Sequence, residues 1–247
     1  MGAASALAVT VHDPGGHFLP GLVRLEQQLR DTFSGGGAVV TDRTHPDVVR
    51  FLSEQVGWEV CSSERDGRVG LHRRLSLDLA LRAGAGTALY SDLDHILRWL
   101  EAAPAEVATA LEADGADLLV VGRSDEAMLA CPARLRETER LVNHAYSLMT
   151  GRPWDVMFGI RRLSGPLARD IVANCTEDSL ANDVEWPLFA ERTGYRLAYL
   201  ASDSLTYRLR EDFDTEADLH DSDPALWIHR IEIANLHAQV LKRYLVS

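Results

Sequence analysis

Apolar and polar positions follow two periods along the first half of the chain. Short apolar runs at 7–11, 38–41 and 87–90 each end in a polar loop, which is typical of buried strands. Between them, residues 19–29 and 70–82 have the spacing of helices, with apolar side chains recurring every three or four positions. Strands that alternate with helices predict parallel crossovers, and hence an α/β sheet covered by helices on both faces.

The second half continues the alternation. Apolar runs at 117–122, 156–161 and 195–200 predict strands, and helical spacing covers 136–150 and 182–193. The other elements predicted in this way are strands at 58–61 and 204–209 and helices over 46–55 and 228–245. Since the chain shows no repeat, linker or low-complexity segment, we expect a single domain over its 247 residues.

The last predicted helix carries an apolar stripe at helical spacing. Its members are Ile231, Ala234, Ala238, Leu241 and Leu245. Packing of this stripe onto the body of the domain is the simpler interpretation, and a homodimer contact is the alternative.

Composition excludes several classes of protein. The net charge of −12 argues against a nucleic-acid binder, which needs clustered Lys and Arg. Lys242 is the only lysine, so the chain has no Gly-Lys-Ser/Thr phosphate loop. Cys61, Cys131 and Cys175 are far apart and odd in number, which fits buried thiols of a reducing compartment. Because no apolar run reaches the ~18 residues of a membrane span, we expect a soluble, cytoplasmic protein.

The candidate chemistry lies where predicted strands end. Asp92 and Asp94 follow the run at 87–90, and alternate side chains of a strand share a face, so both carboxylates can grip one divalent cation. Asp13 and Asp42 follow two other strands, and ligands of α/β sheets collect at such ends. The alternative for the pair is that it caps the next helix.

The same Asp-x-Asp pattern occurs twice more, within an acidic tract. These copies, at Asp212 and Asp214 and at Asp221 and Asp223, follow no apolar run and are typical of a solvated loop.

Several segments, taken in order, resemble the GT-A fold nucleotide-sugar glycosyltransferases. Within them, the likeness is to the family that includes the polyprenyl-phosphate mannosyltransferases and glucosyl-3-phosphoglycerate synthase. The segments are the first strand and its loop, Thr41-Asp42, the stretch from Gly86 to Asp94, Arg140 to Asn143, Leu148 to Gly151, Asp155 to Arg161, and Asn182 to Glu185. The resemblance implies a Rossmann-like mixed sheet flanked by helices, with a nucleotide-binding half at 6–115, a sugar and acceptor half at 116–210, and an acidic loop and C-terminal helix at 211–247.

The resemblance also implies a metal site. Asp94 would ligate Mn²⁺ or Mg²⁺, and Asp92 would hold the ribose or a metal-bound water, or the metal itself. A later histidine sometimes supplies a further ligand in related enzymes, and His220 is the positional candidate. A solvated histidine in an acidic loop is the alternative for His220.

A nucleotide site is implied beside the metal. His12, Asp13 and Asp42 would contact the base. Arg73 or Arg74 would reach the diphosphate, unless these arginines only form a solvated helix face. Many relatives have a proline, an asparagine and a glutamate in the first loop, where this chain has His12, Asp13 and a proline. The donor is therefore left open as a UDP- or GDP-sugar.

For the acceptor, the resemblance implies a late carboxylate that removes the proton of the attacking hydroxyl in inverting members. Asp183 or Glu185 fits that position, and helix capping is the alternative. Asp155 is a further acidic candidate for contact with the sugar or acceptor. We expect inversion, although both stereochemical outcomes occur on this fold.

The leading hypothesis is thus a metal-dependent glycosyltransferase that uses a soluble acceptor. A soluble acceptor is favoured because no membrane anchor is evident in the sequence. Two alternatives stay open. One is a nucleotidyltransferase on a related fold, which would usually carry a basic residue in the first loop. The other is a non-catalytic protein that binds a nucleotide sugar.

Overall fold

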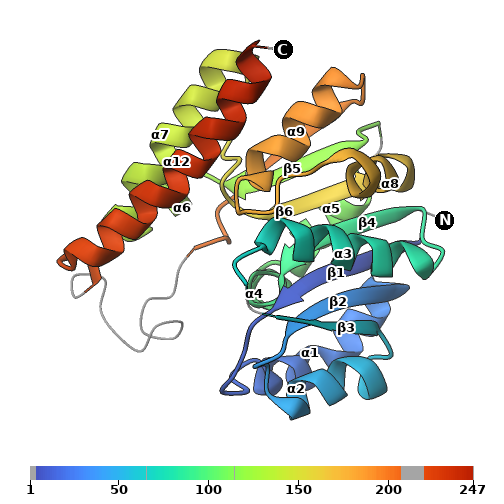
Figure 1. The fold of residues 1–247 in the computed structure, drawn as a ribbon. Coiled ribbons are helices and arrows are strands. Elements are labelled where there is room, and N and C mark those ends of the chain that lie inside the picture. The colour runs from blue at the N-terminus through green and yellow to red at the C-terminus, as the bar shows by residue number, and fades with distance from the viewer. Residues whose placement is uncertain (1–3, 65, 114, 207–219, 247) are drawn as a thin grey trace.

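The computed structural model describes residues 4–64, 66–113, 115–206 and 220–246. Its strands form one seven-stranded sheet in the order β3-β2-β1-β4-β6-β5-β7 (Figure 1). The strands are β1 (Ser5–Val11), β2 (Gly35–Thr41), β3 (Glu59–Ser63), β4 (Thr87–Asp92), β5 (Leu118–Arg123), β6 (Ile160–Ser164) and β7 (Leu197–Ser202). β6 is antiparallel to its neighbours β4 and β5, and the other pairs are parallel. The mixed α/β sheet is as predicted.

The helices have local sequence signals at their ends. They are α1 (Leu19–Thr32), α2 (Pro46–Arg50), the π-helical turn η1 (Phe51–Gln55), α3 (Val69–Arg82), α4 (Leu93–Ala102), α5 (Pro104–Leu111), α6 (Asp125–Leu129), α7 (Ala133–Thr150), α8 (Gly165–Asn174), α9 (Asn182–Arg192) and α12 (Pro224–Val246). The hydroxyl of Ser164 caps α8 by accepting from the backbone N–H of Leu167. Gly151 ends α7 with a φ of 71°, a conformation that favours glycine.

The sheet separates two apolar cores. In β1, Leu7, Val9 and Val11 point to one core, while Ala6 and Ala8 point to the other, and all five are almost fully buried. α1, α2, α4 and α5 contribute to the first core, and α3, α7, α8, α9 and α12 to the second. Because each buried aliphatic side chain contributes about 1.5–3 kcal/mol, burial on both faces fixes the central strands firmly.

The position of β6 differs from the prediction. The run at 156–161 was expected to be a strand, but β6 occupies Ile160–Ser164. The guanidinium of Arg161 is buried and donates to the backbone carbonyls of Val156 and Phe158, at 2.5 and 2.6 Å. These bonds hold the preceding residues in a loop, and this loop lies at the same edge of the sheet as the end of β4.

Two other predicted elements also changed. The helix expected over 46–55 is α2 followed by the π-helical turn. Of the strand expected at 204–209, residues 204–206 are not in a strand, and 207–209 lie outside the described residues.

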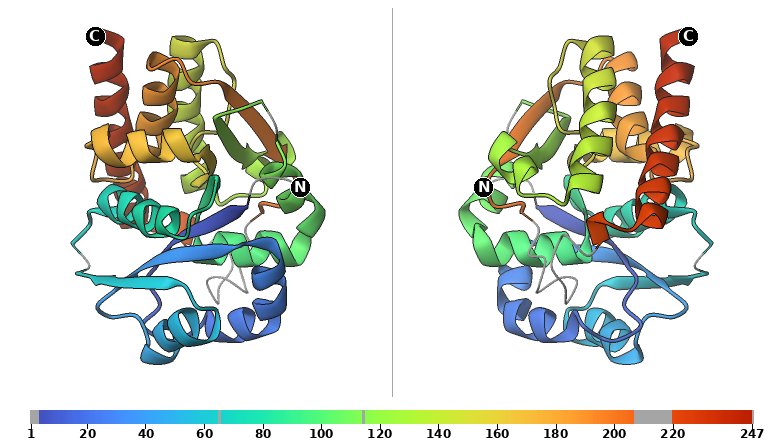
Figure 2. Two further views of the ribbon diagram at one scale, coloured as in Figure 1. Left: turned by 90° about the vertical axis from the view of Figure 1, so that its right-hand side faces the viewer. Right: turned by 90° about the vertical axis from the view of Figure 1, so that its left-hand side faces the viewer.

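α7 and α12 lie side by side and extend beyond the sheet (Figures 1 and 2). In the expected apolar stripe of α12, Leu241 is buried, whereas 57% of Ile231 and 70% of Leu245 is exposed. The stripe therefore packs onto the body only in part, and a homodimer stays a prediction. Within the described residues, no helix is both long and apolar enough to cross a membrane.

Candidate active site

A cavity of about 790 Å³ opens at the carboxyl edge of the sheet; we call it the main cavity. The ends of β1, β2 and β4, the residues before α3 and α9, and the first half of α12 form its walls. Its lining residues are Thr10, Val11, His12, Phe18, Val39, Thr41, Gly67, Arg68, Val69, His72, Asp92, Asp94, His95, Ser179, Leu180, His229, Ile233 and Leu236. Both members of the predicted aspartate pair therefore face one space.

Asp92 ends β4 and is held by two hydroxyl groups. Its Oδ1 accepts hydrogen bonds from Tyr90 at 2.6 Å and from Thr10 at 2.7 Å, and Thr10 is its partner in the β1–β4 register. Asp92 also stands at the N-cap position of α4, yet among the described residues its carboxylate makes no capping hydrogen bond. The helix-cap interpretation of Asp92 is therefore not supported by the geometry.

A buried arginine faces the other oxygen of Asp92. Arg73 Nη2 donates to Asp92 Oδ2 at 3.3 Å. Burial acts to raise the pKa of Asp92, but Arg73, with further help from His95 and the hydroxyl donors, holds that pKa below its usual value. Asp92 is consequently ionised at neutral pH.

Asp94 lies in the first turn of α4 and is the more open of the pair, with 45% of its side chain exposed. Its Oδ2 is 3.7 Å from Nε2 of His95, and the His95 ring stacks on Phe158 at 4.4 Å. The described residues contain no group of three or more His, Cys, Asp or Glu placed to hold a metal ion. Two carboxylates nevertheless fit Mg²⁺ or Mn²⁺, since Mg²⁺ commonly binds one or two carboxylates and takes its other ligands from substrate phosphates and water.

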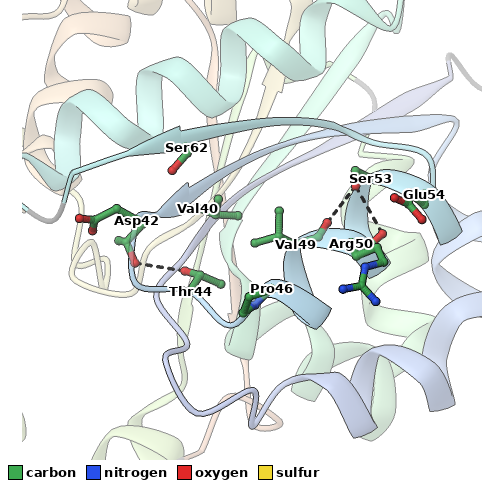
Figure 3. A pocket seen from close by; sticks show the side chains of 10 residues that line it. Val40, Asp42, Thr44, Pro46, Val49, Arg50, Ser53, Glu54 and Ser62 are labelled. Carbon is green, nitrogen blue, oxygen red and sulfur yellow. Dashed lines mark hydrogen bonds between the residues drawn. The ribbon is translucent and has the colours of Figure 1, made fainter.

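Of the three residues predicted to contact the nucleobase, two line cavities and one stabilises a loop. His12 lines the main cavity, and its Nδ1 is hydrogen-bonded to Oγ1 of Thr41 at 2.8 Å. Asp42 is exposed and lines a second cavity of about 410 Å³, the side pocket (Figure 3). Thr41 is among the lining residues of both the side pocket and the main cavity. Asp13 is buried, and its carboxylate accepts from the backbone N–H groups of His17 and Phe18. The side chain of Asp13 thus shapes the loop before α1.

Arg74 has a different environment from Arg73. It donates to the backbone carbonyl of Glu177 at 2.6 Å and pairs with the carboxylate of Asp178. Arg74 thereby ties α3 to the segment before α9. In the described structure, neither arginine is among the residues that line the main cavity.

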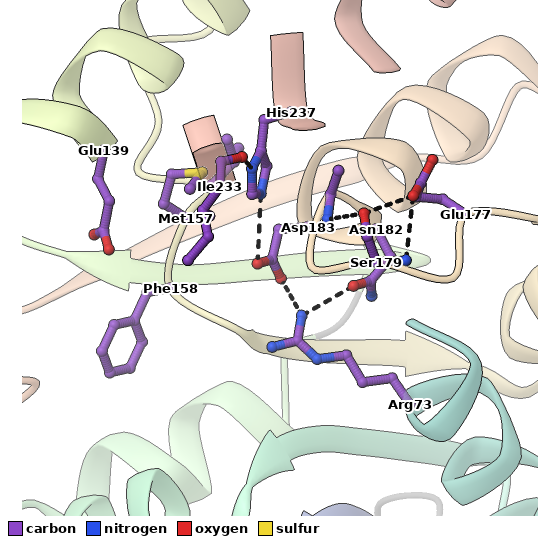
Figure 4. A network of polar contacts seen from close by, with 12 residues as sticks. Arg73, Glu139, Met157, Phe158, Glu177, Ser179, Asn182, Asp183, Ile233 and His237 are labelled. Atoms are coloured by element: carbon purple, nitrogen blue, oxygen red, sulfur yellow. Dashed lines mark hydrogen bonds and ion pairs between the residues drawn. The ribbon is translucent and has the colours of Figure 1, made fainter. Parts of the chain in front are cut away.

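The two predicted general bases are buried in contacts of their own. Asp183 pairs with Arg73 at 2.5 Å (Figure 4). The carboxylate of Glu185 accepts from the backbone N–H groups of Thr176 and Glu177. Burial acts to raise the pKa of Asp183, but Arg73 and then His237 leave that pKa lowered. The pKa of Glu185 is raised, mainly by burial. Neither side chain belongs to the lining of the main cavity as described.

Asp155 lies at a third cavity, of about 350 Å³, beside α7. It pairs with Arg123 at 2.7 Å and accepts from Asn143 at 2.8 Å. Burial acts to raise the pKa of Asp155, but Arg123 holds it below its usual value. Arg123 also pairs with Glu139, so Asp155 belongs to a buried polar cluster.

His220 lies outside the described lining of the main cavity. The next residue, Asp221, accepts from the backbone N–H of Ala133 and from Arg134 at the start of α7. Asp221, next to His220 in the chain, is thus bound to the start of α7, and the predicted role of His220 as a metal ligand stays a prediction.

The structure adds residues that the sequence did not single out. A Cβ on Gly159 would lie 3.0 Å from Arg73 Nη2 and 3.6 Å from Asp92 Oδ2, so this glycine leaves room for their contact. His229, Ile233 and Leu236 of α12 complete the cavity wall. Their spacing along a helix was visible in the sequence, but which face of α12 meets the cavity depends on distant packing.

Solved structures with a similar fold include a glucosyl- and a mannosyl-3-phosphoglycerate synthase. Glucosyl-3-phosphoglycerate synthase from Mycobacterium tuberculosis matches with a TM-score of 0.55 and 12% identity, over 98% of this chain and 81% of that chain. Mannosyl-3-phosphoglycerate synthase from Rubrobacter xylanophilus matches with a TM-score of 0.55 and 14% identity, over 98% and 74%.

A complex of the M. tuberculosis enzyme with Mn²⁺, UDP and glucosyl-3-phosphoglycerate matches with a TM-score of 0.52 and 12% identity, over 98% of this chain and 80% of that chain. No protein-family model and no curated protein matches the chain. The structural likeness confirms the predicted GT-A fold.

Proposed function

We propose that the protein is a glycosyltransferase that moves a sugar from a nucleotide-diphosphate sugar to a hydroxyl of a soluble acceptor, with Mn²⁺ or Mg²⁺. The observation that carries the proposal is that Asp92 and Asp94 line one cavity at the carboxyl edge of a GT-A sheet. Asp92 is ionised and fixed by Thr10 and Tyr90 rather than used as a helix cap. The Mn²⁺ and UDP of the M. tuberculosis complex support the same assignment.

In this proposal, the half at 6–115 binds the nucleotide. The base occupies the side pocket near Asp42, and His12 faces the nucleoside from the main cavity. Asp94 and Asp92 would hold the cation, which when bound neutralises charge on the departing nucleoside diphosphate. Arg73 keeps Asp92 charged and oriented.

The acceptor enters the same cavity from the side of α12. Ile233 and Leu236 of α12, with Val69 of α3 and Leu180 before α9, give the cavity an apolar lining, and His229 of α12 adds a polar group. Phosphoglycerate is the first acceptor to test, because the structural neighbours are named for products built on it. Inversion of the anomeric centre remains part of the proposal.

A second candidate is a protein that binds a nucleotide sugar without transferring it. The observation that favours it is the engagement of both predicted bases in other contacts, Asp183 with Arg73 and Glu185 with backbone N–H groups. Turnover decides between the two. UDP- or GDP-sugar consumed only when an acceptor is added supports the transferase, and tight binding without consumption across a broad panel of donors and acceptors supports the second candidate.

Calorimetry tests the shared donor site. Wild type should bind UDP or GDP tightly only with Mn²⁺ or Mg²⁺, and Asp94→Asn should abolish that dependence. Asp78→Asn is the matched control, because Asp78 is a similarly exposed helical aspartate that pairs with Arg82 on the surface. Equal nucleotide affinity in wild type and Asp94→Asn would contradict the proposed site.

A further inference from the structure

A row of polar and charged side chains connects α12 to the donor site through the interior. It begins at His237, which is fully buried. His237 Nδ1 is 2.8 Å from the carbonyl oxygen of Ile233, so this nitrogen carries a hydrogen and donates. Nε2 is buried, makes no hydrogen bond among the described residues, and lies 3.9 Å from Oδ2 of Asp183 (Figure 4).

The other carboxylate oxygen of Asp183, Oδ1, contacts Arg73. It accepts from Arg73 Nη1 at 2.5 Å, and the same nitrogen donates to Asn182 at 3.1 Å. Arg73 Nη2 then reaches Oδ2 of Asp92 at 3.3 Å. Side chains from α12, α9, α3 and β4 therefore follow one another, with a carboxylate on each side of Arg73.

α12 contributes to the site in a second way. Ile233, whose carbonyl accepts from His237, also lines the main cavity, as do His229 and Leu236. The helix that carries His237 is thus a wall of the cavity into which Asp92 points. A shift of α12 would change both the wall and the partner of Asp183.

We propose that His237 is a positioning residue for the donor site: its contact with Asp183 Oδ2 keeps Oδ1 on Arg73, and Arg73 in turn keeps Asp92 oriented toward the cation and diphosphate. This inference rests on the proposed function. The physical reason is that a buried carboxylate needs partners for both oxygens. Without His237, Asp183 can rotate about its terminal torsion, which has a broad energy profile, and Arg73 loses a fixed anchor.

Two substitutions separate the two contacts of His237. His237→Asn can keep the hydrogen bond to Ile233 but is too short to reach Asp183, whereas His237→Gln can place an amide N–H near the position of Nε2. We expect His237→Asn to weaken UDP binding at saturating Mn²⁺ by about tenfold or more, as loss of an outer partner of a metal site commonly does. His237→Gln should stay within about threefold of wild type by the same scale.

Val240→Ala is the control for a merely structural role. Val240 is buried on the same helix and packs in the apolar core. This variant should lower the midpoint of thermal unfolding through a cavity while leaving UDP affinity unchanged. Isothermal calorimetry with UDP and Mn²⁺ gives the affinities, and thermal unfolding of the same samples gives the stabilities.

The outcomes are distinguishable. Lost affinity in His237→Asn with retained affinity in His237→Gln supports the inference. Equal UDP affinity in both variants and wild type overturns it while leaving the proposed function intact. Losses that follow only the thermal midpoint, with Val240→Ala affected alike, also overturn it. Wild type that binds no nucleotide with Mn²⁺ or Mg²⁺ overturns the proposed function itself, and the inference with it.

Discussion

Arg73→Met is the sharpest test of the buried charges below the site. Arg73 is 2% exposed and donates to three acceptors, on Asp92, Asn182 and Asp183. Methionine fills a similar volume but removes the charge and every donor. Asp183 then stays buried without its closest cation.

We expect Arg73→Met to lower the free energy of unfolding by far more than the loss of an exposed ion pair does. Removing one partner of a buried ion pair typically costs about 3–5 kcal/mol, against a total stability of about 5–15 kcal/mol for a protein domain. The control is Arg82→Met, because Arg82 pairs with Asp78 and 58% of its side chain is exposed. Exposed pairs contribute about 0.2–1 kcal/mol, so the control should remain close to wild type.

The loss in free energy of unfolding caused by Arg73→Met should depend on pH in a defined direction. In wild type, burial acts to raise the pKa values of Asp92 and Asp183, but Arg73 leaves both lowered. These carboxylates therefore stabilise the fold above their unfolded pKa values, and that contribution is lost as pH falls through the folded ones. Without Arg73, burial acts to raise both pKa values. Protonation at acidic pH then removes the unpaired buried charges of the variant and reduces its destabilisation. Its destabilisation should be greatest near neutral pH and shrink toward about pH 4–5.

Urea unfolding at several pH values measures these differences. A second variant, Asp183→Asn combined with Arg73→Met, should recover stability at neutral pH, because it removes the uncompensated charge. A cost for Arg73→Met below about 1 kcal/mol, the range of an exposed pair, would refute the reasoning. A cost that does not change with pH would refute it as well.

Three further predictions concern glycines. Gly159→Ala should weaken UDP binding with Mn²⁺ in calorimetry, since its Cβ would press on Arg73 3.0 Å away and disturb the contact with Asp92. Gly70→Ala should lower the urea midpoint markedly, because its Cβ would lie 2.2 Å from a backbone carbonyl oxygen before α9. Gly21→Ala should raise the urea midpoint, with a gain of up to about 1 kcal/mol in the free energy of unfolding. Gly21 lies within α1, and its Cβ would meet only a side-chain methyl at 3.6 Å. An unchanged midpoint in Gly70→Ala would contradict the close approach of α3 to that segment.

The elements that the sequence predicts well are those whose burial is set locally. β1, β2 and β4 are buried almost throughout, so their apolar runs are continuous, and polar residues stand where each run ends. β6 was misplaced because Arg161 and Arg162 are buried within a central strand. Their charges are satisfied by backbone carbonyls such as those of Val156 and Ala116, which no local pattern reveals.

In the site too, local features could be predicted from the sequence and contacts between distant elements could not. Asp92 was identified because it ends a buried strand, a local property. The partners of Arg73 and Asp183 could not be foreseen, because 110 positions separate the two residues and their meeting depends on how α3 and α9 pack. An acidic residue in the first turn of a helix has the same local sequence pattern whether its side chain faces solvent, a metal or a buried arginine.

The partners of each carboxylate therefore decide its role better than its place in the sequence does. Asp155 and Asp183 each face a buried arginine at 2.5–2.7 Å, so their charge is already neutralised within the protein. Asp94 has 45% of its side chain exposed and lines the main cavity, and a ring nitrogen of His95 lies 3.7 Å from its carboxylate. Asp92 lies between these cases, ionised through Arg73 and still on the cavity wall. Among these four, Asp92 and Asp94 are the two that line the main cavity, where a cation and a diphosphate could reach both carboxylates.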